Sequence, residues 1–222
     1  MEVNKRLVLA LPKGRLLNEV MPLVRKAGIK PEIAFEDSEV RQLRFKTNIP
    51  NLDIIRVRSF DVATFVAFGA AHIGVVGNDV LMEFDYPELY APLDLNIGHC
   101  RVSVAELETG KDNEDPETLS TIRVATKYPD MTHKYFLNKG VNAECIKLSG
   151  AMELAPQLGL CQRIVDLVST GATLKANGLV EIESICDVTA RLIVNRVAWK
   201  TDPHFINEWV DQFREVVNAK MD

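Results

Sequence analysis

The residues best suited to chemistry lie between Glu153 and Gly178. The apolar run 163–168 predicts a buried strand, and a turn of small and hydroxyl residues follows it at positions 169–173. Gly171 would let the backbone of this turn approach an anion closely or adopt a positive φ. Serine and threonine hydroxyls, and free amides at the start of a following helix, would donate hydrogen bonds to that anion. The pattern indicates a phosphate-binding turn, although an ordinary strand–turn–helix with a threonine N-cap has the same sequence features.

Two acidic residues accompany this turn. Asp166 lies inside the apolar run, and Glu153 precedes the run. A carboxylate only accepts hydrogen bonds, so it suits the hydroxyls of a sugar better than the oxygens of a phosphate. Phosphate-binding groups beside carboxylates therefore indicate a phosphorylated sugar as the ligand. The alternative is an aspartate that merely ends a strand.

Basic residues follow two strands expected in the first half of the chain. Lys13, Gly14 and Arg15 come directly after the first apolar run, and Arg58 ends a later one. Ligands of α/β sheets bind where strands end, and an arginine beside a helix start can hold a phosphate. Solvated loop charge is the alternative interpretation at both places.

The fold must position these residues. Strand and helix patterns alternate along the chain, which is typical of an α/β fold. Long β-rich segments near residues 93–105 and 182–196 join two such series and predict two lobes with crossing strands. The expected strands of the two series cover residues 6–11, 53–58, 72–77, 122–126, 143–148 and 163–168.

Several residues predict helix starts. Ser59 and Asp130 suit N-cap positions, and Asp202-Pro203 is typical of a helix with proline at its first position. Pro22 lies within a helical pattern and indicates a kink or a helix that begins late.

Two polar segments and one apolar stripe complete the pattern. Residues 32–50 are compatible with a short hairpin, and residues 111–120 predict a loop. The helix expected after position 203 has one continuous apolar stripe and is the clearest amphipathic helix in the chain.

Composition excludes several classes of protein. The 222 residues suffice for one large or two small domains, and the net charge of −5 gives no basic surplus for nucleic acid or an anionic membrane. There is no apolar run of membrane-spanning length, and the N-terminus lacks a signal-peptide pattern. The four cysteines are widely spaced, which predicts reduced, mostly buried thiols and no metal site. We expect a cytoplasmic protein that binds neither nucleic acid nor membrane.

The segment DLVSTGATLKANGL, preceded by SGAMELAP, closely resembles the phosphoribosyl-pyrophosphate loop of the ATP phosphoribosyltransferase family, which performs the first step of histidine biosynthesis. The resemblance covers nearly the whole chain. In the first half, the family has the same KGR after its first strand and an arginine at the position of Arg58. His72 departs from the family pattern, which has an acid there, and we expect it to be a partly buried structural histidine.

The resemblance implies a two-lobed α/β fold like that of type II periplasmic binding proteins, with the ligand cleft between the lobes. Lobe I would comprise residues 1–98, with residues 188–222 returning to it. Lobe II would comprise residues 99–187 and carry the phosphoribosyl-pyrophosphate loop.

The resemblance also implies a reaction. N1 of the adenine of ATP would displace pyrophosphate from C1 of 5-phosphoribosyl 1-pyrophosphate, giving phosphoribosyl-ATP. Positioning and electrostatics would stabilise a cationic sugar, so no catalytic general base is assigned. Mg²⁺ would be carried on the substrate phosphates, with few or no protein ligands. The residues implied for donor binding are Glu153, Asp166, Ser169, Thr170, Gly171, Ala172 and Thr173. Those implied for binding ATP or phosphate are Lys13, Gly14, Arg15, Arg58 and Asp79.

The resemblance, taken with the length, also implies partners. Long members of the family carry a C-terminal regulatory domain, which we expect this chain to lack. It resembles the short form, which works in a hetero-oligomer with a regulatory subunit similar to histidyl-tRNA synthetase. The resemblance further implies a homodimer of catalytic chains.

Two other functions remain open at this point. The first is a phosphoribosyltransferase with another acceptor base, but the large salvage group has two adjacent acids before its loop, whereas Leu167 follows Asp166 here. The second is a non-enzymatic binding module on the same bilobal fold. A missing export signal disfavours a solute receptor, and a missing DNA-binding segment disfavours a transcriptional regulator.

Overall fold

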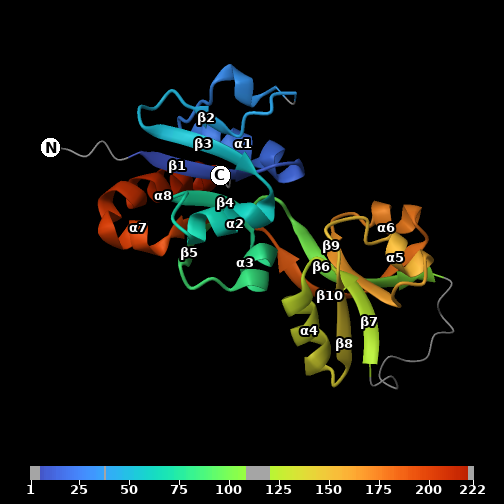
Figure 1. Cartoon of the computed structure of the whole chain (residues 1–222). Helices are drawn as coiled ribbons and strands as arrows, with labels where there is room; N and C mark the ends of the chain where they lie inside the picture. Colours follow the sequence, from blue (N-terminus) through green and yellow to red (C-terminus); the bar gives the residue numbers. More distant parts are fainter. Residues whose placement is uncertain (1–5, 38, 109–120, 220–222) are drawn as a thin grey trace. The chain divides into compact units, whose positions relative to one another are not determined.

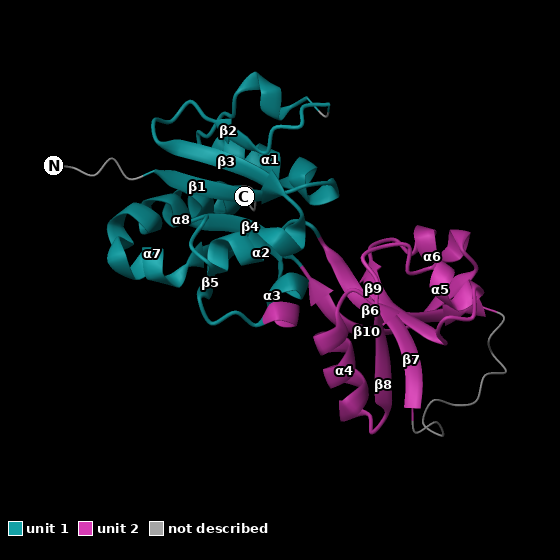
Figure 2. Ribbon diagram, in the orientation of Figure 1, with its two compact units in different colours: residues 1–81, 85–98, 189–222 teal, residues 82–84, 99–188 magenta. Residues whose placement is uncertain are grey.

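A computed structural model describes residues 6–37, 39–108 and 121–219 (Figure 1). The chain divides into two compact units (Figure 2). Unit 1 comprises residues 1–81, 85–98 and 189–222, and unit 2 comprises residues 82–84 and 99–188.

Unit 1 is built on a six-stranded sheet with the order β2-β3-β1-β4-β11-β5. β1 pairs in parallel with β3 and β4, while β2, β11 and β5 join the sheet by antiparallel pairing. The strands are β1 (Leu7–Pro12), β2 (Arg44–Lys46), β3 (Leu52–Val57), β4 (Ile73–Gly77), β5 (Leu89–Asp94) and β11 (Ala190–Asn195). The helices are α1 (Arg15–Lys26), η1 (Ile33–Phe35), α2 (Ser59–Ala67), α3 (Asn78–Phe84), α7 (Arg196–Thr201) and α8 (Pro203–Asn218). The last three residues of α3, 82–84, belong to unit 2.

Both faces of the β1–β4 region are covered, which explains why these strands are apolar throughout. Leu7, Leu9 and Leu11 belong to the core formed with α1 and with the buried stripe of α8. On β4, a Cβ atom at Gly74 would lie 2.8 Å from Val62 Cγ1 of α2. Only glycine therefore allows α2 to pack this closely on the sheet.

Unit 2 is built on a five-stranded sheet with the order β10-β6-β9-β7-β8. β9 lies at its centre, parallel to β7 and antiparallel to β6, and β7 is also parallel to β8. The strands are β6 (Cys100–Leu107), β7 (Thr121–Thr126), β8 (Asn142–Lys147), β9 (Arg163–Val168) and β10 (Leu179–Val188). The helices are α4 (Pro129–Asn138), α5 (Leu154–Gln157) and α6 (Ala172–Ala176).

Three predicted helix starts differ from the structure. α1 begins at Arg15, so the late start that Pro22 indicated is wrong. Ser59 is the first helical residue of α2, because Arg58 has extended dihedral angles and occupies the N-cap. Asp130 lies inside the first turn of α4, whose N-cap is Tyr128. By contrast, α8 begins at Pro203 as predicted, and Asp202 caps it by accepting a hydrogen bond from the Phe205 amide.

The capping group of α4 comes from a distant part of the chain. Glu83 is 5% exposed, and its carboxylate accepts the amides of Asp130 at 3.1 Å and Met131 at 3.0 Å. A carboxylate at a helix N-terminus satisfies amides that have no partner within the helix and interacts favourably with the helix dipole. This long-range contact explains why the local sequence predicted the wrong capping residue.

The less regular segments give a mixed outcome. The hairpin expected within residues 32–50 exists in part, because β2 pairs antiparallel with β3, which follows that segment. The loop expected at residues 111–120 lies outside the described residues. All four cysteines are free, but Cys161 alone is buried and the other three are half-buried, so the expectation of mostly buried thiols is wrong.

Candidate functional site

In the turn after β9, the backbone adopts the positive φ that the sequence predicted as one option for Gly171. Gly171 adopts a left-handed conformation with φ 76° and occupies the N-cap of α6. Thr170 Oγ1 accepts a hydrogen bond from the Ala172 amide at 3.3 Å, which holds the turn closed. Gly171 is half-buried, and the other residues of the turn are exposed. A ligand can therefore reach both the hydroxyls and the backbone.

The helix that follows this turn is short. α6 has five residues, so its dipole adds little to anion binding compared with a long helix. Binding here would depend on amides of the first helical turn, which have no intrahelical partner, and on the hydroxyls of Ser169, Thr170 and Thr173.

Asp166 lies near the carboxyl end of β9, just before the turn. Its Oδ1 accepts the Leu167 amide at 2.7 Å and is 3.0 Å from Nζ of Lys127. The side chain of Asp166 is 20% exposed. Lys127 follows β7, the parallel neighbour of β9, and the sequence interpretation did not single it out. The reasoning applied to Lys13, a basic residue directly after a strand, would have found it.

Glu153 occupies the N-cap position of α5 and is half-buried. Its neighbours Met152 and Ala155 pack in the same apolar cluster as Val168 and Leu174, which flank the turn. The structure therefore anchors the segment of Glu153 and the turn on one core within unit 2.

A second polar group missed from the sequence supports the turn from β6 and β10. Arg101 forms a bidentate ion pair with Glu181, with Nε 2.5 Å from Oε1, and its Nη1 donates to the carbonyl oxygen of Ser169 at 3.3 Å. Ser103 Oγ donates to the same carboxylate at 2.8 Å. The hydrogen bonds from Arg101 lower the pKa of Glu181, and this carboxylate raises the pKa of Arg101. The cross-strand register that joins these residues is not visible in the sequence.

The predicted basic residues of unit 1 come together at one sheet edge. β1 and β3 are parallel with Pro12 opposite Val57, so Lys13 and Arg58 leave adjacent strands at their carboxyl ends. The Lys13 amide donates to the Val57 carbonyl at 2.7 Å. Gly14, with φ 83°, forms the N-cap of α1, and Arg15 is its first residue. Lys13, Arg15 and Arg58 are exposed, and Arg15 Nε lies 3.7 Å from Glu19 Oε1.

Asp79 differs from these residues because it is only 4% exposed. It lies in the first turn of α3, directly after β4, where a negative charge interacts favourably with the helix N-terminus. A buried position this close to the same sheet edge suits a residue that orders the backbone there.

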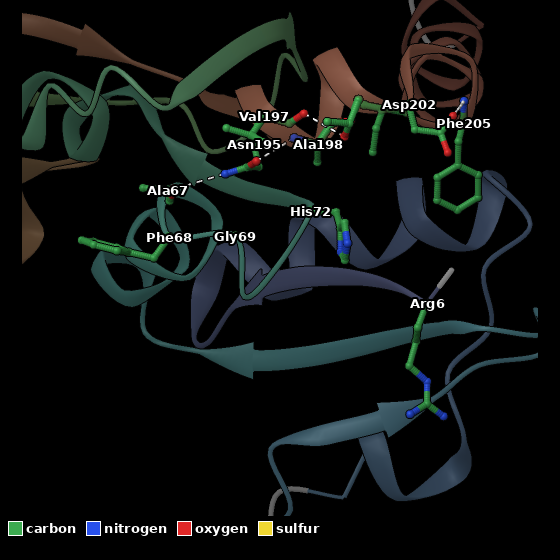
Figure 3. Close-up of a pocket in the computed structure, with 12 residues that line it drawn as sticks. Arg6, Ala67, Phe68, Gly69, His72, Asn195, Val197, Ala198, Asp202 and Phe205 are labelled. Atoms are coloured by element: carbon green, nitrogen blue, oxygen red, sulfur yellow. Dashed lines mark hydrogen bonds between the residues drawn. The ribbon is translucent and has the colours of Figure 1, made fainter. Parts of the chain in front are cut away.

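A cavity of about 630 Å³ in unit 1 lies away from these residues (Figure 3). Arg6 and His72, which precede β1 and β4, line it, so it opens at the amino ends of these strands. None of the predicted site residues lines it. His72 is partly buried, and its Nδ1 accepts the Val8 amide at 3.2 Å, which confirms the structural role expected for it.

Within the described ranges, no group of three or more His, Cys, Asp or Glu side chains is arranged to hold a metal ion. The helices of the described part of the chain are all too short or too polar to cross a membrane.

The comparisons with known proteins identify the family. Residues 58–215 match the family model described as HisG: ATP phosphoribosyltransferase. The chain belongs to this family. It is 66% identical over 214 residues to the ATP phosphoribosyltransferase of Rhodospirillum rubrum, covering 96% of this chain and 94% of that protein. It is 47% identical to that of Citrifermentans bemidjiense, covering 92% of this chain and 95% of the relative. The chain is thus an enzyme, a transferase of the first step of histidine biosynthesis, as the resemblance implied.

Solved structures agree on the fold. The ATP phosphoribosyl transferase (HisG:HisZ) complex from Thermotoga maritima matches with a TM-score of 0.80 and 33% identity, over 96% of this chain and 99% of that one. The periplasmic aliphatic sulphonate binding protein SsuA from Escherichia coli matches with a TM-score of 0.56 at 15% identity. These matches confirm the predicted fold class, that of type II periplasmic binding proteins.

Proposed function

We propose that unit 2 binds 5-phosphoribosyl 1-pyrophosphate, the donor substrate, at the carboxyl end of β9. The turn formed by residues 169–173 would hold the 5-phosphate, and Asp166 and Glu153 would accept hydrogen bonds from the ribose hydroxyls. The observation that carries this proposal is the left-handed Gly171 in the turn that follows the strand of Asp166. Phosphate-binding groups and a sugar-binding carboxylate thereby lie on one short connection. Ala172, the first residue of α6, would contribute through its backbone amide, which would donate to the phosphate in place of Thr170 Oγ1.

We propose that the sheet edge of unit 1 binds phosphates of ATP or of the leaving pyrophosphate. Lys13, Arg15 and Arg58 would supply the positive charge, and Gly14 would let the backbone approach an oxygen closely. Asp79 would belong to the same site by ordering the start of α3. Three exposed basic side chains at adjacent strand ends support this assignment.

These roles fit a reaction that needs little proton transfer. N1 of adenine carries no proton at neutral pH, so it can attack C1 of the ribose without a general base. Positive charge develops on the sugar and negative charge on the leaving pyrophosphate. Carboxylates at the ribose and basic groups at the phosphates would stabilise both through preorganised electrostatics.

We propose Mg²⁺ as the metal, bound mainly to the pyrophosphate of the donor. Mg²⁺ prefers oxygen ligands, retains water and commonly binds through substrate phosphates with few protein ligands. The ion would neutralise charge on the leaving group.

We also propose that the chain acts with a regulatory subunit resembling histidyl-tRNA synthetase, as a homodimer of catalytic chains within a cytoplasmic hetero-oligomer. The similar chain from Thermotoga maritima was solved as a HisG:HisZ complex, which supports a partner of this kind.

A product assay with a donor-binding measurement tests the proposal. Purified chain would be mixed with ATP, the donor, Mg²⁺ and pyrophosphatase, and mass spectrometry would detect phosphoribosyl-ATP. Substitutions in unit 2 should raise the KM of the donor, and substitutions of Lys13 or Arg58 should weaken inhibition by pyrophosphate or raise the KM of ATP. Formation of product with an unchanged donor KM in every unit 2 variant would contradict the proposed donor site.

A further inference from the structure

We infer that Lys127 is a further substrate-binding residue, which recognises the ribose hydroxyls of the donor together with Asp166. This inference rests on the proposed placement of the donor sugar at Asp166. It adds the hydrogen-bond donor that a carboxylate cannot provide.

Lys127 lies where a ligand of this sheet would bind. It directly follows β7, and the parallel register places Thr126 opposite Val165, so Lys127 lies beside Asp166, which is still within β9. Their charged atoms, Nζ and Oδ1, are 3.0 Å apart. The carboxyl edge of parallel strands is the usual ligand-binding edge of α/β sheets.

The surroundings of Lys127 hold it in place. The hydroxyl of Thr126 donates to the Val165 carbonyl at 2.9 Å and accepts the Tyr128 amide at 2.9 Å, which fixes the backbone on both sides. The ammonium group also lies 5.1 Å from the ring centroid of Tyr128, a fully buried residue. A side chain ordered in this way loses little further conformational entropy when a ligand binds.

The ion pair leaves hydrogen-bonding capacity on both partners. Oδ1 of Asp166 makes both contacts of this carboxylate with described residues, to Lys127 and to the Leu167 amide. Within the part of the chain that the structure describes, Oδ2 has no partner, and Lys127 donates to Asp166 alone. An ammonium group has three donors, so further donors are available.

This arrangement matches a sugar hydroxyl. A hydroxyl can donate one hydrogen bond and accept others. A ribose hydroxyl can therefore donate to Oδ2 of Asp166 while the same hydroxyl, or its neighbour on the ring, accepts from Nζ of Lys127. A sugar without that hydroxyl would leave both charged groups without these bonds, which disfavours its binding.

The alternative to a role in sugar binding is an ordinary surface ion pair between Lys127 and Asp166. Such a pair contributes little to stability. The side chains of Lys127 and Asp166 are 26% and 20% exposed, so they are sheltered but still reachable from solvent. The two interpretations differ in whether removal of the ammonium changes sugar affinity.

The experiment compares Lys127→Met with Lys147→Met. Methionine keeps an unbranched side chain and removes the charge. Lys147 ends β8 at the same edge, opposite Thr126, and is exposed, so it controls for loss of one positive charge nearby. Titration calorimetry or competitive inhibition would measure the affinities for ribose 5-phosphate and for inorganic pyrophosphate separately. Steady-state kinetics would give kcat and the KM of the donor.

We expect Lys127→Met to weaken the binding of ribose 5-phosphate and of the donor by roughly ten- to hundredfold, which is the range for loss of a hydrogen bond to a charged group. Pyrophosphate inhibition should stay unchanged, Lys127→Arg should restore part of the affinity, and Lys147→Met should behave as the parent chain. If the methionine variant does not fold, Lys127→Gln allows the same comparison. The double variant Lys127→Met, Asp166→Asn should lose less affinity for the sugar than the product of the two single fold-losses, because both residues contact the same pair of hydroxyls.

The outcomes separate this inference from the proposed function. If Asp166→Asn weakens sugar binding while Lys127→Met and Lys127→Gln do not, the role of Lys127 is wrong and the donor site stands. If Lys127→Met weakens the binding of pyrophosphate but not that of ribose 5-phosphate, the inferred contact with the sugar is wrong. If Asp166→Asn has no effect on any ligand, the donor placement itself fails.

Discussion

Arg101 of β6 donates a hydrogen bond from Nη1 to the carbonyl oxygen of Ser169, across 3.3 Å. Ser169 is the first residue of the turn proposed to bind the donor phosphate. The same guanidinium is held by a bidentate ion pair with Glu181 of β10. A three-strand connection therefore fixes the point at which the chain leaves β9, and the shape of the turn depends on residues far away in the sequence.

This connection predicts that Arg101→Met raises the donor KM by roughly tenfold, the order expected when a hydrogen bond from a charged group is lost. The change should fall on KM more than on kcat, because Arg101 positions the turn without touching the reacting atoms. Lys139→Met is the control, because it breaks another ion pair to β10, with Glu183, at an exposed place. Equal donor KM values in the two variants would show that Arg101 does not support the turn.

Asp166→Asn should weaken donor binding by roughly tenfold or more, because an amide cannot replace a carboxylate as a charge-assisted acceptor. It also removes the ion pair with Lys127. Thermal unfolding should change little, because a partly exposed ion pair contributes about 0–1 kcal/mol. Glu144→Gln, at an exposed position of β8, is the matched control for loss of one carboxylate. Wild-type donor affinity in Asp166→Asn would show that the ribose assignment is wrong.

Gly171→Val should reduce donor affinity by more than its effect on stability explains. Nothing lies within 4 Å of a Cβ atom at Gly171, so the protein itself has space for a side chain, and the structural cost is the left-handed φ of 76°, about 1–2 kcal/mol. Gly140 provides a matched control with the same φ of 76° and the same open space, after α4. Both valine variants should lower the unfolding midpoint similarly, while only Gly171→Val should lose donor affinity. Equal donor affinities would locate the phosphate elsewhere.

The sequence predicted those features that depend on local pattern. The buried strand 163–168 coincides with β9, and the positive φ of Gly171 follows from the strand-to-helix turn. The α/β fold class was also predicted and is confirmed by the structural matches. The capping of α4 by Glu83 and the contact between Arg101 and Ser169 were not predictable, because both depend on strand order and register. Hydrophobic periodicity indicates which face of a strand is buried but not which strand lies beside it.

Acid should weaken the fold partly through Glu181. Hydrogen bonds from Arg101, and then from Ser103, hold its pKa below the ordinary value of 4.5. Its stabilising contribution is therefore complete above about pH 4.5 and is lost as the pH falls through the lowered pKa of the folded state. Urea unfolding can be measured at a series of pH values from neutral to acid. The free energy of unfolding should fall more steeply with decreasing pH for the parent chain than for Glu181→Gln. A parallel pH dependence in the two proteins would contradict this contribution, and Glu144→Gln serves as the control carboxylate.

Glu83→Gln should destabilise unit 2 while leaving the proposed donor contacts in place. The carboxylate is 5% exposed and accepts two amides of α4, one on each oxygen. A glutamine offers one oxygen and one NH₂ group, so one buried amide would lose its acceptor and face a donor instead. The expected cost is about 1–3 kcal/mol in the free energy of unfolding. Hydrogen exchange should report faster exchange at the amides of Asp130 and Met131. Glu88→Gln, at an exposed position in unit 1, should leave both exchange rates and the unfolding free energy unchanged. If exchange at these two amides stays slow in Glu83→Gln, the start of α4 is stabilised by other groups, and Glu83 is not its cap.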